Sequence, residues 1–272
     1  GNVVVVNGVS ADQASTVDAS DVAHIVAVTG GRRVNLGFLQ TCEGLGCTEV
    51  RDVRVRQALN YGVDIQAILD AFFFGKAERA AGFVNPPHDL KTLEPYPYDP
   101  EKAKELLAEA GYPDGFKCTI GSPNGRYQKD KELAIAIAAD WKKIGVDCEV
   151  IPYEWTVYST MLNEKTLPAI FLIGNGSNFS SAWYDISTLA TPTQTSNYPQ
   201  WGNEEFAELV ASLRTTYDLE ERTAITDRMQ QVIHDEAPWL FIYMQVDWYA
   251  VNNDLNWTPR ADEIVEFTSA SW

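Results

Sequence analysis

The run from residue 99 to residue 151 alternates helix and strand signals, and this alternation constrains the fold more than any other feature. Asp99-Pro100-Glu101 predicts a helix start, because an aspartate can cap the first turn and proline and an acid suit its first positions. Residues 116–120 and 146–151 alternate apolar and polar side chains, as strands do. Apolar residues at helical spacing lie between them. Strand, helix and strand in this order predict a right-handed parallel βαβ unit.

Similar signals continue on both sides of this unit. Asp52, Asp64 and Asp218 each precede an apolar helical pattern and are predicted to cap helices. Two further helices are expected at 204–217 and 219–235. The expected strands outside the βαβ unit cover residues 3–6, 34–39, 167–174, 239–243 and 248–251. Without a repeat, a low-complexity run or a clear linker, the chain is predicted to form one mixed α/β body.

The charge of the chain limits its partners. There are 38 acidic and 21 basic residues, a formal net charge of −17. Nucleic acids and anionic membrane surfaces need a basic face, so neither is an expected partner. The apolar run Val3–Val6 is far too short to cross a bilayer, and the start lacks the pattern of a signal peptide. The chain as given is expected to be soluble, with any export signal outside it.

Four cysteines allow three pairings. Cys42 and Cys47 share a glycine-bearing segment that could close on itself. Cys118 and Cys148 lie in the two strands of the predicted βαβ unit and could meet if these strands are neighbours. Two buried free thiols are the alternative. The spacing of Cys42 and Cys47 is a poor match to zinc sites, which need a second pair of ligands.

Neither catalysis nor a metal site is indicated. His24, His88 and His234 are scattered, and none has a second ligand type three or four residues away within a predicted helix. The carboxylate pairs Asp218/Glu221 and Glu204/Glu205 are explained by helix caps and solvated faces. The sequence therefore predicts neither an enzyme nor a bound cofactor or metal.

Several motifs, taken in order, resemble one family. They are residues 55–59 (VRQAL), 98–112 (YDPEKAKELLAEAGY), 125–127 (GRY), 143–146 (KIGV), Asp218 with Arg222, and 235–238 (DEAP). Each alone is common in helices, but their order and spacing resemble the family 5 extracellular solute-binding proteins, over roughly residues 34 to 251. These are the peptide, nickel and oligosaccharide receptors of ABC importers. The resemblance implies a periplasmic-binding-protein-like lobe of type II, a mixed sheet with βαβ units and flanking helices.

The resemblance also implies that a first lobe is missing. Family members are two-lobed clamps of about twice this length, so the chain is expected to be the carboxy-terminal lobe, an engineered piece or a fragment. Residues 1–40 are expected to lead from the first lobe, 41–236 to form the second lobe, and 237–272 to return. Such a lobe would supply half a ligand site. The implied partners are the first lobe, a small solute and the ABC permease, and the implied location is extracytoplasmic, with a membrane anchor in the full-length protein.

Two loops after predicted strands are candidates for ligand contact, because ligands of α/β lobes bind beyond the carboxyl ends of strands. Arg126 and Tyr127 lie in the first, where the arginine could grip a carboxylate through two hydrogen bonds. The alternative is an arginine that pairs with a surface acid. Glu154 and Trp155 lie in the second, where the aromatic ring could stack on a sugar or a peptide group. The alternative for Trp155 is core packing.

The third candidate loop spans residues 174–185. In the oligopeptide receptors a similar segment, gWxxDYxDP, holds the amino terminus of the peptide through its tryptophan and aspartate. Here Asn175 and Asn178 stand at those positions. An amide lacks the full charge that an ammonium group prefers, so these residues and nearby Trp183 favour a neutral, hydroxyl-rich ligand such as an oligosaccharide. Core packing is again the alternative for the tryptophan.

The function expected from the sequence is capture of a small solute, a peptide or an oligosaccharide, for delivery to an ABC importer. The alternative is a ligand-sensing or interaction module derived from the same lobe. The sequence does not fix the ligand or the oligomeric state.

Overall fold

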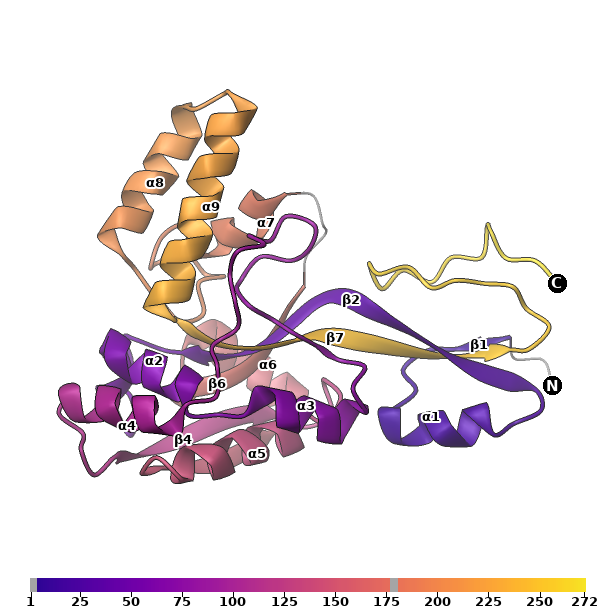
Figure 1. Ribbon diagram of the computed structural model, residues 1–272, viewed down its shortest axis with the longest axis horizontal. Helices are drawn as coiled ribbons and strands as arrows, with labels where there is room; N and C mark the ends of the chain where they lie inside the picture. Colours follow the sequence, from indigo (N-terminus) through magenta and orange to yellow (C-terminus); the bar gives the residue numbers. More distant parts are fainter. Residues whose placement is uncertain (1–3, 177–180) are drawn as a thin grey trace.

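One mixed sheet runs through the whole molecule (Figure 1). The computed structural model describes residues 4–176 and 181–272. Six strands follow the order β1-β7-β2-β6-β4-β5, and β3 pairs with β7 beside this path. The strands are β1 (Val5–Val6), β2 (Ala23–Phe38), β3 (Glu78–Arg79), β4 (Phe116–Pro123), β5 (Val146–Tyr153), β6 (Ile170–Gly176) and β7 (Trp239–Asn252). Both parallel and antiparallel pairs occur, which confirms the predicted mixed sheet.

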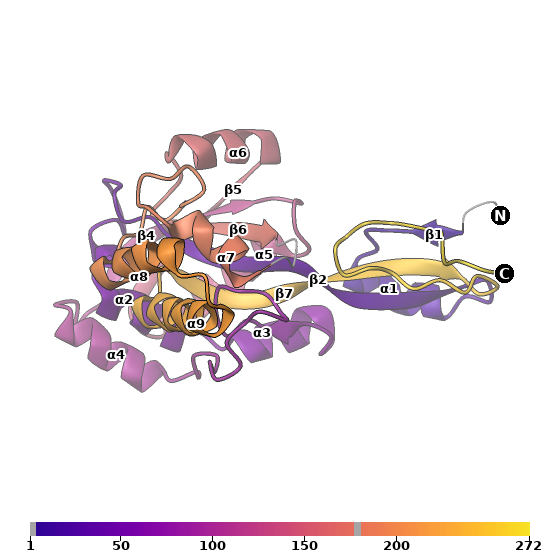
Figure 2. The same cartoon turned by 90° about the horizontal axis from the view of Figure 1, so that it is seen from above.

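Helices cover the sheet on both sides (Figures 1 and 2). In Figure 1 α2 to α5 lie below β2 and β7, whereas α7, α8 and α9 rise above them. The helices are α1 (Ala11–Asp18), α2 (Val53–Tyr61), α3 (Ile65–Phe73), α4 (Pro100–Glu109), α5 (Asp130–Lys142), α6 (Trp155–Glu164), α7 (Ala182–Ile186), α8 (Glu204–Thr215) and α9 (Leu219–Glu236), with 3₁₀ turns at Glu49–Arg51 and Ser187–Leu189.

Local signals placed most of these helices correctly. The predicted caps accept the backbone N–H groups that a helix start leaves free: Asp52 from Arg54, Asp64 from Ala67, Asp99 from Lys102 and Asp218 from Glu221. The predicted βαβ unit is confirmed, because β4 and β5 are parallel neighbours connected through α5. In this register Cys118 lies opposite Cys148, and the two form a disulfide. Cys42 and Cys47 form the second disulfide.

The two longest strands form a ribbon that leaves the body of the lobe (Figures 1 and 2). β2 begins at Ala23, earlier than the predicted start at residue 34, and β7 is one strand where two short ones were predicted. Antiparallel pairing continues from Gly37↔Trp239 to Ala23↔Asn252. Both ends of the described chain lie at the far end of this ribbon. The added length comes from pairing between distant segments, which local patterns do not reveal.

A small apolar cluster stabilises the far end of the ribbon. Tyr249, Val251, Leu255 and Trp257 are buried there, apart from the main core of the lobe. The ring of Trp257 packs edge-on against that of Tyr249, with centroids 5.4 Å apart. The ribbon therefore ends in a packed unit of its own, which includes the segment that follows β7.

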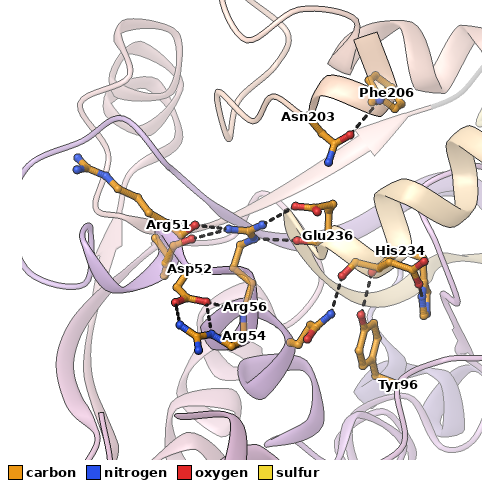
Figure 3. A network of polar contacts seen from close by, with 12 residues as sticks. Arg51, Asp52, Arg54, Arg56, Tyr96, Asn203, Phe206, His234 and Glu236 are labelled. Atoms are coloured by element: carbon orange, nitrogen blue, oxygen red, sulfur yellow. Dashed lines mark hydrogen bonds and ion pairs between the residues drawn. The ribbon is translucent and has the colours of Figure 1, made fainter. Parts of the chain in front are cut away.

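Buried Arg56 joins two distant motifs, VRQAL and DEAP (Figure 3). It is 2% exposed, and its Nε donates to the Glu236 carbonyl at 2.8 Å. Its Nη1 donates to the carbonyls of Val50 and Arg51, and its Nη2 pairs with the Glu236 carboxylate at 3.2 Å. Arg56 thereby satisfies carbonyls at the end of α9 and before α2 that have no partner inside a helix. The two motifs are a structural joint between these helices.

Candidate functional site

The loop after β4 presents Arg126 and Tyr127, and a buried carboxylate shapes it. Asp130, at the start of α5, is 2% exposed. Its Oδ1 accepts the backbone N–H of Gly125 at 3.0 Å, and its Oδ2 accepts those of Arg126 at 2.8 Å and Tyr127 at 3.0 Å. Gly125 has a φ of +87°, a conformation that glycine adopts without strain. The Asp130 carboxylate thus holds the backbone of the turn, which leaves the Arg126 side chain free to meet a ligand.

Arg126 lies over two aromatic rings. Its guanidinium carbon is 5.1 Å from the ring centroid of Trp155 and 5.3 Å from that of Tyr127. The two rings meet edge to face with centroids 6.2 Å apart. The Arg126 side chain is exposed, and no carboxylate of the described residues is within ion-pair distance of it. The alternative of a surface ion pair at Arg126 is therefore not found in this part of the chain.

Tyr127 connects this loop to β6. Its side chain is buried, and burial raises the pKa of its hydroxyl above the ordinary value. The ring crosses β6 at Gly174, where an added Cβ would lie 2.6 Å from a ring carbon. Glycine at this position therefore allows the tyrosine to approach the strand closely, and Tyr127 borders the strand end that carries Asn175.

Glu154 and Trp155 begin a helix, which corrects the prediction of a loop. Glu154 is the N-cap of α6, and its Oε2 accepts the Thr156 N–H at 2.8 Å. Trp155 is half-buried and stacks on Tyr158, with ring centroids 6.0 Å apart. The segment WTVYSTMLNE does not predict a helix, because it is rich in β-branched, aromatic and hydroxyl residues, which are weak helix formers. Glu154 has a structural role as a cap, whereas Trp155 stays beside Arg126.

Asn175 lines a cavity of about 360 Å³ at the end of β6. Arg33 of β2 lies opposite Asn175 in the sheet and also lines this cavity. Its Nη1 is 3.6 Å from an Asp185 carboxylate oxygen, and both side chains are buried. Asp185 also accepts the Asn85 N–H at 2.9 Å. Sequence reasoning missed Arg33 and Asp185, although Arg33 and Asn35 alternate with apolar residues along β2, a pattern that indicates polar groups on one face.

Trp183 lines a different cavity, of about 670 Å³, between the 87–92 segment, α7 and α9. Leu219, Arg222 and Asp227 of α9 are among its lining residues. Trp201 is fully buried in the core. Asn178 lies outside the described residues. The structure thus brings Arg126, Tyr127 and Trp155 together beside the strand that carries Asn175, and it places Trp183 in a separate cavity.

Within residues 4–176 and 181–272, no group of three or more His, Cys, Asp or Glu side chains is placed to hold a metal ion. None of the helices in these ranges is long and apolar enough to cross a membrane.

Several curated proteins are similar to this chain in sequence. It is 36% identical to heme-binding protein A of Haemophilus influenzae over 204 residues, which cover 70% of this chain and 36% of the relative. It is 33% identical to the dipeptide-binding protein of Escherichia coli over 205 residues, 70% of this chain and 37% of the relative. The alignments thus span little more than a third of these relatives.

Solved structures share the fold. A dipeptide-binding protein of Pseudoalteromonas sp. SM9913, in complex with Met-Leu, superposes with a TM-score of 0.82 at 25% identity, over 99% of this chain and 54% of that one. A periplasmic binding protein of Helicobacter pylori in complex with the peptide STSA gives a TM-score of 0.81 at 23% identity, over 94% of this chain and 50% of that one. The profile of bacterial extracellular solute-binding proteins, family 5, middle region, matches residues 1–197. The chain therefore belongs to the family 5 bacterial extracellular solute-binding proteins.

Proposed function

We propose that this chain is the ligand-binding lobe of a receptor that captures a small peptide and delivers it to an ABC importer. One observation carries the proposal. Arg126 follows β4, Trp155 follows β5 and Asn175 lies at the end of β6, and these three strands run parallel. The residues therefore share the edge of the sheet where α/β proteins bind ligands.

A peptide suits the chemistry of this edge. Exposed Arg126 offers two parallel N–H groups, which match the two oxygens of a peptide carboxylate. Trp155 and Tyr127 offer aromatic surface for an apolar side chain or a peptide plane. Two of the similar proteins are described with bound peptides, which supports the same class of ligand here. Binding without chemical conversion is the proposed activity.

An oligosaccharide is the second candidate, and Asn175 is the reason to keep it. An amide at this position hydrogen-bonds neutral groups and lacks the charge that an ammonium group prefers. Half-buried Trp155 would serve as a stacking surface for a sugar ring. Arg126, Tyr127, Trp155, Asn175, Asn178 and Trp183 remain the proposed ligand contacts, with Glu154 beside them as the cap that orients Trp155.

We also propose how the lobe fits into a larger receptor. In this proposal residues 41–236 form most of the lobe. Residues 1–40 and 237–272, which carry its central strands β2 and β7, connect it to a first lobe through the β2–β7 ribbon (Figure 2). The ligand lies between the two lobes, which close by a hinge motion. In this proposal the receptor acts outside the cytoplasm, attached to the membrane, and its closed form docks on the permease subunits.

Thermal stabilisation of the complete gene product tests the proposal. The panel contains di- to pentapeptides, oligosaccharides and nickel chelates, because a ligand far above its dissociation constant raises the melting temperature. A shift with peptides that falls in Arg126→Ala and Trp155→Ala, but persists in Arg214→Ala at an exposed position of α8, is the expected result. A shift with sugars alone favours the second candidate. No shift with any compound contradicts the proposed function.

A further inference from the structure

Arg33 is an arginine that is buried inside the sheet. It is 1% exposed and lies on β2, opposite Asn175 of β6 and Met244 of β7. Its guanidinium carbon lies 4.6 Å from the ring centroid of Phe83, against which it packs. Arg33 and Asn175 both line the cavity of about 360 Å³. An arginine is rarely buried this completely unless partners satisfy its charge and its donors.

The charge of Arg33 is balanced by one carboxylate. Asp185 Oδ2 lies 3.6 Å from Arg33 Nη1. Burial lowers the pKa of the guanidinium to about 10, and the Asp185 carboxylate opposes this change, so Arg33 remains protonated at neutral pH. Asp185 is buried as well. One positive and one negative group therefore face the cavity, and their charges cancel.

The charge of Arg33 has a partner, but its hydrogen-bond donors are not all paired. Its Nε and Nη1 have no hydrogen-bond acceptor among the described residues, since 3.6 Å is too long for a hydrogen bond. The Oδ1 of Asn175 likewise has no donor within the described part of the chain. Two donors of Arg33 and one acceptor of Asn175 are thus buried without partners, on two residues that line the same cavity. Such groups cost free energy unless a partner completes them.

We propose that this cavity is a ligand subsite, in which Arg33 and Asn175 bind an uncharged polar group of the solute that carries both an acceptor and a donor. A carboxamide or a sugar hydroxyl has this chemistry. The inference rests on the proposed function, because it assigns a specificity to one part of the same ligand-binding edge.

The charge balance explains why the group should be uncharged. A carboxylate in the cavity would add a second negative charge next to Asp185, so one buried charge would lack a partner. An apolar group would fit the volume but leave the Arg33 donors unpaired. Sites with buried polar groups discriminate strongly against ligands that cannot pair with them.

Calorimetric titration of the complete gene product tests the subsite with three isosteric side chains. Tripeptides of alanine carry Gln, Glu or Met at the first, second or third position. At one position the Gln peptide is expected to bind about tenfold more tightly than both the Glu and the Met peptide, the cost of one unpaired polar group. A second arm uses oligosaccharides of glucose, which present only hydroxyls.

Two variants test whether the buried Arg33–Asp185 pair causes the preference for the Gln peptide. Asp185→Asn keeps an acceptor for the Asn85 N–H but leaves the cavity with a net positive charge, so the Glu peptide should become the tightest ligand. Arg33→Lys keeps the charge but loses the Nε donor, so the Gln preference should shrink while the Glu peptide stays weak. Circular dichroism confirms folding, and Arg33→Lys alone decides the question if Asp185→Asn does not fold.

Each outcome separates the two proposals. Peptides that bind equally well with Gln, Glu and Met, in the parent and in both variants, overturn the subsite but leave the proposed function intact. Oligosaccharides that bind in place of peptides, and lose affinity in Arg33→Lys, support the subsite with hydroxyls as its ligand. Absence of binding by every peptide and sugar overturns both.

Discussion

Arg56 joins the end of α9 to the segment before α2, and its removal should destabilise the lobe strongly. Arg56→Ala leaves the carbonyls of Val50, Arg51 and Glu236 without their donors in a buried place. Loss of a buried charged group that makes several hydrogen bonds typically costs about 3 kcal/mol of unfolding free energy. Urea unfolding followed by circular dichroism measures the change.

The neighbouring Arg54 provides the matched control. It lies in the same helix and pairs with Asp52 at the surface, where solvent screens the interaction. Arg54→Ala should therefore change stability much less than Arg56→Ala. Equal losses in the two variants would contradict the structural role assigned to Arg56 and to the VRQAL motif.

At the scale of the elements, the two disulfides should contribute unequally to stability. The Cys118–Cys148 disulfide, which joins β4 to β5, should stabilise the protein more than the Cys42–Cys47 disulfide. The sequence separation is 30 residues for Cys118–Cys148 and 5 for Cys42–Cys47. By the loop-closure argument, removal of the longer cross-link costs about 3.6 kcal/mol and removal of the shorter about 2 kcal/mol. Paired Cys→Ser variants, compared by urea unfolding, test this order, and a larger loss at Cys42–Cys47 would contradict it.

The ribbon contains an aspartate that should make its stability depend on pH. Burial raises the pKa of Asp247 on β7, and its Oδ2 has no hydrogen-bond partner in the described structure. A raised folded-state pKa means that the stabilising contribution of Asp247 is full at pH values below the unfolded pKa and is lost as pH rises through the folded one. Asparagine does not ionise, so Asp247→Asn avoids this loss of stability at high pH. Its side-chain oxygen still accepts the hydrogen bond from Gln245 Nε2.

The variant should therefore melt at a higher temperature than the parent at pH 7, and the difference should vanish towards pH 3. Differential scanning calorimetry at several pH values measures the difference. Asp254→Asn, which changes an exposed aspartate just beyond the same strand, is the control. A destabilised Asp247→Asn protein at pH 7 would contradict the account.

Elements with strong local signals could be predicted from the sequence, and those that depend on distant partners could not. The aspartate caps and the alternation of 116–120 and 146–151 gave the α4–β4–α5–β5 order correctly. The full length of β2 and β7 depends on their pairing with each other. α6 depends on burial of Tyr158 and Leu162, which outweighs the weak helix propensity of its sequence.

The residues of the candidate site also divide into those that the sequence predicts and those that only the fold brings together. Arg126, Tyr127 and Trp155 could be placed at one edge because each follows a recognisable strand. The Arg33–Asp185 pair could not, because the two residues meet only when β2 and α7 come together in the fold. Trp183 was grouped with the other contacts by proximity in sequence to Asn175, whereas α7 directs it into a different cavity.

At the scale of the whole molecule, the lobe presents one edge of its sheet and extends a two-stranded ribbon away from its body (Figure 1). The ribbon strands β2 and β7 are also the central strands of the sheet. Arg33 lies on one of them, next to the point where β2 begins to pair with β6. β2 and β7 thus connect the ligand-binding edge to the proposed first lobe. Ligand binding and hinge closure would therefore be coupled through these two strands.

The most direct test of the account compares one peptide ligand on two proteins. The tightest peptide from the panel is titrated by calorimetry into the complete gene product and into the isolated 272-residue chain. Because the isolated chain is proposed to supply half a site, its affinity should be weaker by a factor of about a hundred or more, a loss of about 3 kcal/mol in binding free energy. Equal affinity for both proteins would show that this chain holds a complete site, and it would contradict the two-lobed account.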